Sequence, residues 1–69
     1  MFDGDAFTKA VKAKGLRMQT VAEIMQMDRS TLYQKVKGNR EFTLGEIQRS
    51  RAFFDEAEMM SIFFAEKVS

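Results

Sequence analysis

The stretch VAEIMQMDRSTLYQKVKG, residues 21–38, decides the fold that we expect for this chain. Its apolar residues recur at helical spacing in two blocks, with Val21 and Met25 in the first block and Leu32 and Val36 in the second. Polar side chains that donate hydrogen bonds surround the second pair. The pattern therefore predicts two short helices, and the second presents a polar face that the core does not need.

The two helices are predicted over about residues 18–25 and 29–37, which is the spacing of a helix-turn-helix unit. Ala22 is small enough for the second helix to cross closely over the first, and Met27 supplies an apolar residue inside the turn. Asp28 can cap the second helix by accepting from the free amides of its first turn. In such a unit the second helix protrudes, and its outer face can enter a major groove of DNA.

The rest of the chain predicts three further helices. An aspartate-capped helix is expected over about residues 3–14, and Thr43 with Glu46 forms a capping box at the start of another. A second cap in the sequence DEAE opens a C-terminal helix and tail over residues 55–69. The expected fold class is all-α: a single domain, residues 1–69, that forms a compact five-helix bundle containing a helix-turn-helix.

The composition argues against an enzyme. The chain has no histidine and no cysteine, which are the commonest nucleophiles and metal ligands of small enzymes. A 69-residue domain buries one thin core and has little room for a closed cleft. The apolar runs are too short to span a membrane, so we expect a soluble protein that works by binding, with no cofactor, metal or small-molecule ligand.

The charge is unevenly distributed along the chain, although the net charge is only +1. Residues 9–40 carry eight basic and two acidic side chains, which gives +6, whereas residues 41–69 carry three basic and six acidic side chains, which gives −3. A molecule with one basic and one acidic part can present the basic part to a polyanion. The alternative is a solvated surface whose charges are merely uneven.

The predicted second helix has an outer face suited to DNA. With Leu32 and Val36 turned to the core and about 100° per residue, Ser30 and Gln34 point away from the core. Arginine can bind guanine and glutamine can bind adenine with two hydrogen bonds each, and a tyrosine ring can cover a thymine methyl group. The residues expected to contact bases are Arg29, Ser30, Tyr33 and Gln34. The simpler alternative is that these side chains form an ordinary solvated face.

Other polar and basic residues are placed for the phosphate backbone, either on the second helix and just past its end or near the start of the first. These expected phosphate contacts are Lys14, Arg17, Gln19, Thr31, Lys37, Asn39 and Arg40.

The segment VAEIMQMDRSTLYQKVKGNREF, residues 21–42, resembles the helix-turn-helix of the lambda-repressor-like (XRE-type) family, to which phage repressors and Cro proteins belong. More narrowly, RMQTVAEIMQMDRSTLYQKVKGNREFT, residues 17–43, with the later EI and IFFAEKV, is similar to small helix-turn-helix proteins encoded by phages of Gram-positive bacteria. The resemblance extends over about residues 7–67. It implies a five-helix domain that binds operator DNA, usually as a symmetric dimer, in the cytoplasm of a bacterial host.

The resemblance also implies that base readout falls on Arg29, Ser30 and Gln34, with Tyr33 assisting. Gln26 stands where the family usually has glycine in the turn, so it must take a left-handed conformation or alter the turn.

The start of the first helix of the unit departs from the family as well. Arg17 and Met18 replace the usual Thr-Gln, which removes a cap and a glutamine that commonly touches phosphate. Gln19 can substitute for that glutamine if the helix begins later.

The C-terminal region carries more large apolar side chains than one side of two short helices can bury. We expect Phe54, Met60 and Phe64 to point inward. The surplus can close the core of the single chain, because the C-terminal helix must cover the others, or it can form a two-fold contact that would set two recognition helices about 34 Å apart on successive major grooves. We expect a mixture of the two. The expected dimer contacts are Met59, Ile62, Phe63 and Val68.

The functional hypothesis is a sequence-specific double-stranded DNA-binding protein, a transcriptional repressor or Cro-like regulator of phage or prophage origin. The alternative is a protein-binding module, similar to an anti-repressor, that uses its aromatic and methionine-rich C-terminal helix on another protein.

Overall fold

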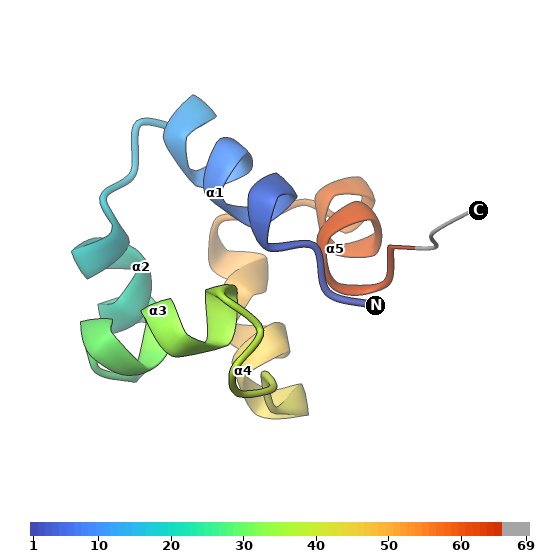
Figure 1. Ribbon diagram of the computed structural model, residues 1–69. Coiled ribbons are helices and arrows are strands. Elements are labelled where there is room, and N and C mark those ends of the chain that lie inside the picture. Colours follow the sequence, from blue (N-terminus) through green and yellow to red (C-terminus); the bar gives the residue numbers. More distant parts are fainter. Residues whose placement is uncertain (66–69) are drawn as a thin grey trace.

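The computed structural model describes residues 1–65, and it confirms the all-α prediction. No strand occurs among these residues. The elements are α1 (Gly4–Ala13), α2 (Met18–Ile24), α3 (Arg29–Val36), α4 (Leu44–Arg49), the 3₁₀ turn η1 (Ser50–Ala52) and α5 (Glu56–Phe63). In Figure 1, α2 and α3 lie at one side of the molecule and α5 lies at the other, with α1 running between them. No helix of the described part is long and apolar enough to cross a membrane.

Helices α1, α2 and α3 each end in a residue with left-handed backbone: Gly15 (φ 70°), Gln26 (φ 59°) and Gly38 (φ 87°). At Gln26 the amide donates to the Glu23 carbonyl at 3.1 Å, and the next amide, of Met27, donates to the Ala22 carbonyl at 3.0 Å. This pair of bonds satisfies the last carbonyls of α2 and turns the chain toward α3. The left-handed conformation considered for Gln26 is therefore confirmed.

Side chains cap most helix N-termini as the sequence predicts. Asp3 accepts from the Ala6 amide at 3.0 Å, and complete capping boxes open α4 at Thr43 and α5 at Asp55. Asp28 is different, because it stands at the N-cap of α3 but its side chain makes no capping hydrogen bond. The capping role predicted for Asp28 is therefore wrong.

The core is rich in phenylalanine. Phe7 is fully buried in α1, and its ring centroid lies 5.4 Å from that of Phe54 and 6.3 Å from that of Phe63. Phe2 precedes the Asp3 cap and packs at 5.8 Å from Phe7, the residue four positions into the helix. That spacing is a hydrophobic staple, which fixes how the chain enters α1.

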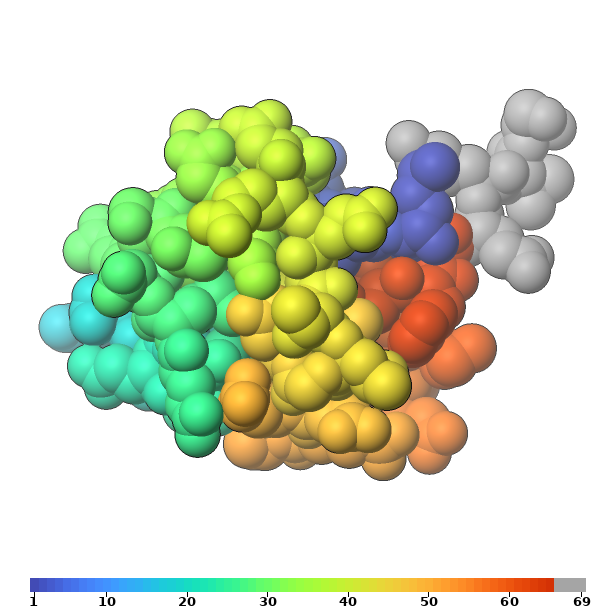
Figure 2. Space-filling model, turned by 90° about the horizontal axis from the view of Figure 1, so that it is seen from below, coloured from blue at the N-terminus to red at the C-terminus, as the bar shows by residue number. Residues whose placement is uncertain are grey.

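The N-terminal segment is tied to the end of α5. The Asp3 amide donates to the Ile62 carbonyl at 2.7 Å, and the Met1 amino group donates to the Ala65 carbonyl at 3.1 Å. Figure 2 shows the N-terminal residues, in blue, lying against α5, in red. The first bond satisfies a carbonyl in the last turn of α5, which has no intrahelical partner, and the second holds the residue that follows the end of the helix.

The start of α1 approaches the end of α3 very closely. A Cβ atom built on Gly4 would lie 2.3 Å from the Val36 carbonyl oxygen. Any residue other than glycine would therefore clash with α3 at this position. The contact sets the position of α3 against the body of the domain.

The predicted orientation of α5 is wrong. Met59, Ile62 and Phe63, expected at a dimer contact, are buried in the core of the single chain, at 5%, 1% and 6% exposure. Met60 and Phe64, expected inside, are 56% and 50% exposed. Both sets repeat at helical spacing, so the amphipathic pattern alone does not decide which of them faces the core. Phe54 is buried as expected, and Val68 lies outside the described residues.

Candidate nucleic-acid interface

The outer side of α3 is open to solvent. Leu32 is fully buried, whereas Ser30, Gln34 and Lys37 are exposed, as the helical spacing predicts. Arg29, at the first position of the helix, is exposed as well. In Figure 2, α3 and the loop that follows it form one edge of the molecule, with no other element in front of them.

Arg29 and Tyr33 form a pair on this face. The guanidinium carbon of Arg29 lies over the Tyr33 ring, 5.5 Å from its centroid, and the ring is 37% exposed. The two residues are four positions apart, so they face each other across one helical turn. The contact restricts the arginine to a subset of its rotamers and leaves the N–H donors in the plane of the guanidinium available.

Gln34 is held by Asn39. The Asn39 side-chain amide donates to Gln34 Oε1 at 2.8 Å, and the Asn39 backbone amide donates to the Gln34 carbonyl at 3.0 Å. Asn39 was expected at a phosphate, and its side chain instead contacts the proposed base reader. The bond leaves the Gln34 Nε2 donors and one lone pair of its Oε1 free to face outward.

The start of α2 lies next to the start of α3. Arg17 and Gln19 line a hollow together with Met18, Arg29 and Tyr33. The structure therefore brings two of the expected phosphate contacts beside two of the expected base contacts. Arg17 occupies the N-cap position of α2 with extended backbone and makes no side-chain capping bond.

Lys14 lies elsewhere in the fold. Its Nζ pairs with Glu58 Oε1 at 2.8 Å and so links the end of α1 to α5. The hydrogen bond from Lys14, with a second from the Asp55 amide, holds the pKa of Glu58 below its ordinary value. A lysine engaged in this way is less available to a phosphate than Arg17.

Thr31 and Lys37 have acidic neighbours. Thr31 is half-buried and lines a hollow that is also lined by Glu23 and Asp28. Lys37 lines another hollow, whose walls include Asp3 and Asp5. These carboxylates lower the positive potential at both places, including the turn between α2 and α3, where Glu23 and Asp28 lie.

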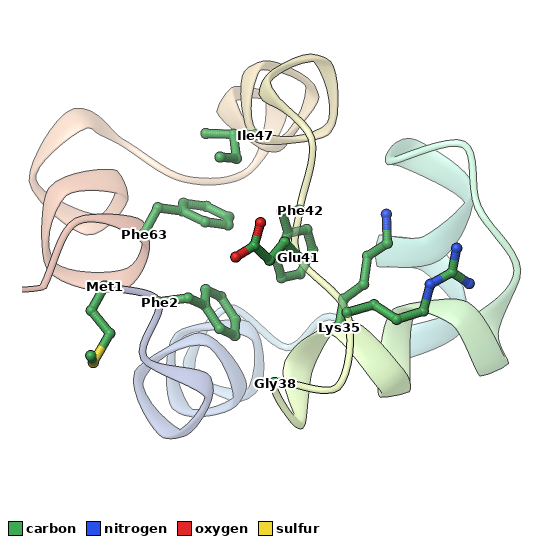
Figure 3. Close-up of a pocket in the computed structure, with 9 residues that line it drawn as sticks. Met1, Phe2, Lys35, Gly38, Glu41, Phe42, Ile47 and Phe63 are labelled. Carbon is green, nitrogen blue, oxygen red and sulfur yellow. The ribbon is translucent and has the colours of Figure 1, made fainter.

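Arg40 lines a fourth hollow, which has a volume of about 360 Å³. Its apolar walls include Phe2, Phe42 and Phe63, whose ring centroids are 4.8 to 5.5 Å apart. Figure 3 shows these three rings turned toward a common space, with Ile47 above them. The hollow lies between the N-terminal segment before α1, the inner side of α3 with the loop that follows it, α4 and α5.

Lys35, one of the eight basic residues of 9–40, is buried in the structure. It is 6% exposed, and its Nζ meets Glu46 Oε1 at 2.5 Å and lies 5.9 Å from the Phe42 ring centroid. Partial burial raises the pKa of Glu46, but the bonds from Lys35 and from the Thr43 amide outweigh it and hold that pKa below its ordinary value of 4.5.

The signal for this pair was present in the sequence. Lys35 stands three positions after Leu32 and one before Val36, which places it at the edge of the buried stripe. Glu46 is the glutamate of the predicted capping box, so its position at the start of α4 was also foreseeable.

Within residues 1–65 no group of three or more histidine, cysteine, aspartate or glutamate side chains could hold a metal ion. Comparison of the chain with protein-family models, with curated proteins and with solved structures found no significant match in any of the three.

Proposed function

We propose that the protein binds double-stranded DNA in a sequence-specific way, with α2 and α3 as a helix-turn-helix and α3 as its recognition helix. One observation carries the proposal: Arg29, Ser30 and Gln34 of α3 are all exposed. Occupying an operator would make the protein a repressor or Cro-like regulator, because a bound protein excludes RNA polymerase without catalysis or a cofactor.

The charges of the described residues support the proposal. Two ion pairs occur within residues 1–65, Lys14 with Glu58 and Lys35 with Glu46. Six of the eight basic side chains of residues 9–40 therefore have no carboxylate partner in that part of the chain. Cations without partners can neutralise phosphates and release the counterions that DNA has condensed.

Each side chain has a role in the proposed complex. Arg29 and Gln34 present donors to base edges in the major groove, and Ser30 reaches a base or a phosphate. Arg17 and Gln19, beside Arg29, bind the phosphates that flank the groove and fix the register of α3.

We infer further that two copies bind together and that Met60 and Phe64 form the contact between them. Met60 lies on α5, Phe64 is the residue that caps its C-terminal end, and both are half exposed. Burying a large apolar side chain contributes about 1.5–3 kcal/mol, so a two-fold contact would recover stability that the single chain leaves in water. Sedimentation of the wild type and of a Met60→Ser/Phe64→Ser variant tests this contact, since only the wild type should form dimers.

The same two side chains support the alternative, a module that binds another protein through α5. Titration of the chain with a mixed-sequence DNA duplex at low salt distinguishes the two. The DNA-binding proposal expects affinity that falls steeply with salt, with a slope of about −0.9 in log K against log salt for each phosphate that a lysine or arginine neutralises. No binding at low salt would contradict it.

A pair of matched variants tests whether the salt dependence comes from the proposed interface. Arg17→Ala should reduce the magnitude of the slope by about one, because it removes one phosphate contact. Arg51→Ala removes the same charge from the exposed η1 turn, outside the proposed interface, and should leave the slope unchanged.

A further inference from the structure

Arg29 and Tyr33 are one helical turn apart, and their side chains are in contact. One turn advances about 5.4 Å along a helix, and successive bases along a DNA strand are about 3.4 Å apart. Two side chains on successive turns of a helix in the major groove therefore reach different base pairs, one or two steps apart.

While the two side chains are in contact, each still has one part that can contact a base pair. The guanidinium carbon of Arg29 lies 5.5 Å from the ring centroid, and the N–H groups of the guanidinium can bind the O6 and N7 acceptors of guanine. Tyr33 is 37% exposed, so part of its ring remains open beside the guanidinium. The apolar group that a base pair offers to such a ring in the major groove is the C5-methyl group of thymine.

We propose that Arg29 and Tyr33 act as one unit that reads a guanine together with the C5-methyl group of a pyrimidine one or two base pairs away. The inference rests on the proposed DNA binding and adds to it the kind of sequence that is bound. The hollow shared with Arg17 and Gln19 holds the flanking phosphates, which keeps the ring in the groove. Because the recognised group is the methyl itself, 5-methylcytosine at that position replaces thymine.

The test begins with duplexes enriched by the wild-type protein from a random pool. Each thymine within two base pairs of a guanine in the enriched sequence is then replaced by deoxyuridine, which differs only in lacking the methyl group. One such replacement should weaken binding about fourfold for each half-site that carries it, the loss expected for one buried methyl group. In a second pair of duplexes, that thymine–adenine pair is replaced by 5-methylcytosine–guanine or by unmethylated cytosine–guanine. The protein should bind the methylated duplex more tightly than the unmethylated one by a similar factor.

Variants of Tyr33 separate the ring from the hydroxyl group. Tyr33→Phe keeps the ring and should retain the deoxyuridine effect, whereas Tyr33→Ala should lose it, with helical content by circular dichroism showing that both are folded. A deoxyuridine effect that is absent in the wild type, or that persists in Tyr33→Ala, would overturn the inference while leaving DNA binding intact. Failure to enrich any sequence would instead overturn the proposed function.

Discussion

Lys35 of α3 and Glu46 of α4 meet through a 2.5 Å contact in which the two side chains are 6% and 13% exposed. Glu46 also belongs to the capping box of α4, so one carboxylate fixes the start of α4 and holds α3 against it. The position of the proposed recognition helix therefore depends on a pair of charges on its inner side, opposite the face that we propose meets DNA.

Replacing Glu46 by glutamine should destabilise the domain by about 3 kcal/mol at neutral pH, because it leaves the Lys35 charge buried without a partner. Glutamine preserves the capping box, so the loss reports the ion pair. Glu58→Gln is the matched control, since it makes the same change in the other capping box and removes the more exposed Lys14 pair. We expect the control to cost less than about 1 kcal/mol. Urea unfolding measures both, and equal losses would contradict the burial argument.

Acid should weaken the same contact. The pKa of Glu46 is lower in the folded protein than its ordinary value of 4.5, so its stabilising effect is complete above pH 4.5 and disappears as the pH falls through the lowered folded value. The difference in unfolding free energy between the wild type and Glu46→Gln should therefore shrink as the pH falls from 7 to 2.5. A difference that stays constant over this range would show that the carboxylate charge contributes nothing.

Gln26→Gly should stabilise the domain by about 1 kcal/mol. A residue with a Cβ atom at φ 59° loses about 1–2 kcal/mol, and glycine avoids this loss at the cost of its own greater freedom in the unfolded chain. For a domain of this size the midpoint of thermal unfolding should rise by about 4–8 °C. Gln26→Ala removes the side chain and keeps the strain, so a midpoint for the alanine variant as high as for the glycine variant would contradict the explanation.

Gly4→Ala should destabilise the domain by about 2 kcal/mol or more, because the new Cβ atom would lie 2.3 Å from the Val36 carbonyl oxygen and would push α1 away from α3. Gly45→Ala is the control in α4, where the nearest atom to an added Cβ is Thr43 Oγ1 at 4.0 Å. There the change should stabilise the helix by about 0.5–1 kcal/mol. Two losses of similar size would contradict the close approach.

Much of the fold was predictable because short-range chemistry decides it. The capping boxes at Thr43 and Asp55 and the left-handed ends at Gly15 and Gly38 depend on residues within one turn of each other. The outer face of α3 was predictable for the same reason, since Leu32 has no competing apolar residue on the opposite side of the helix.

The errors lie where two orientations are equally apolar or where a distant residue intervenes. In the sequence, Met60 and Phe64 follow the helical spacing just as the buried residues of α5 do. Only the packing of α5 against α1 decides which of the two sets faces the core. The pairing of Lys35 with Glu46 was not predicted, because this carboxylate lies eleven positions later in the chain.

The most direct test of the proposed function is a selection of bound duplexes from a random pool, repeated with Arg29→Ala, Gln34→Ala, Arg51→Ala and Gln48→Ala. Gln48 and Arg51 are exposed on α4 and η1 and match the two α3 residues in chemistry. We predict that the wild type and the Arg51 and Gln48 variants enrich the same two-fold repeated sequence. The Arg29 and Gln34 variants should each lose selectivity at one position of each half-site by about 5- to 150-fold, or 1–3 kcal/mol. Enrichment of the same sequence by all four variants, or retention of no duplex at low salt, would contradict the assignment of α3 as a recognition helix.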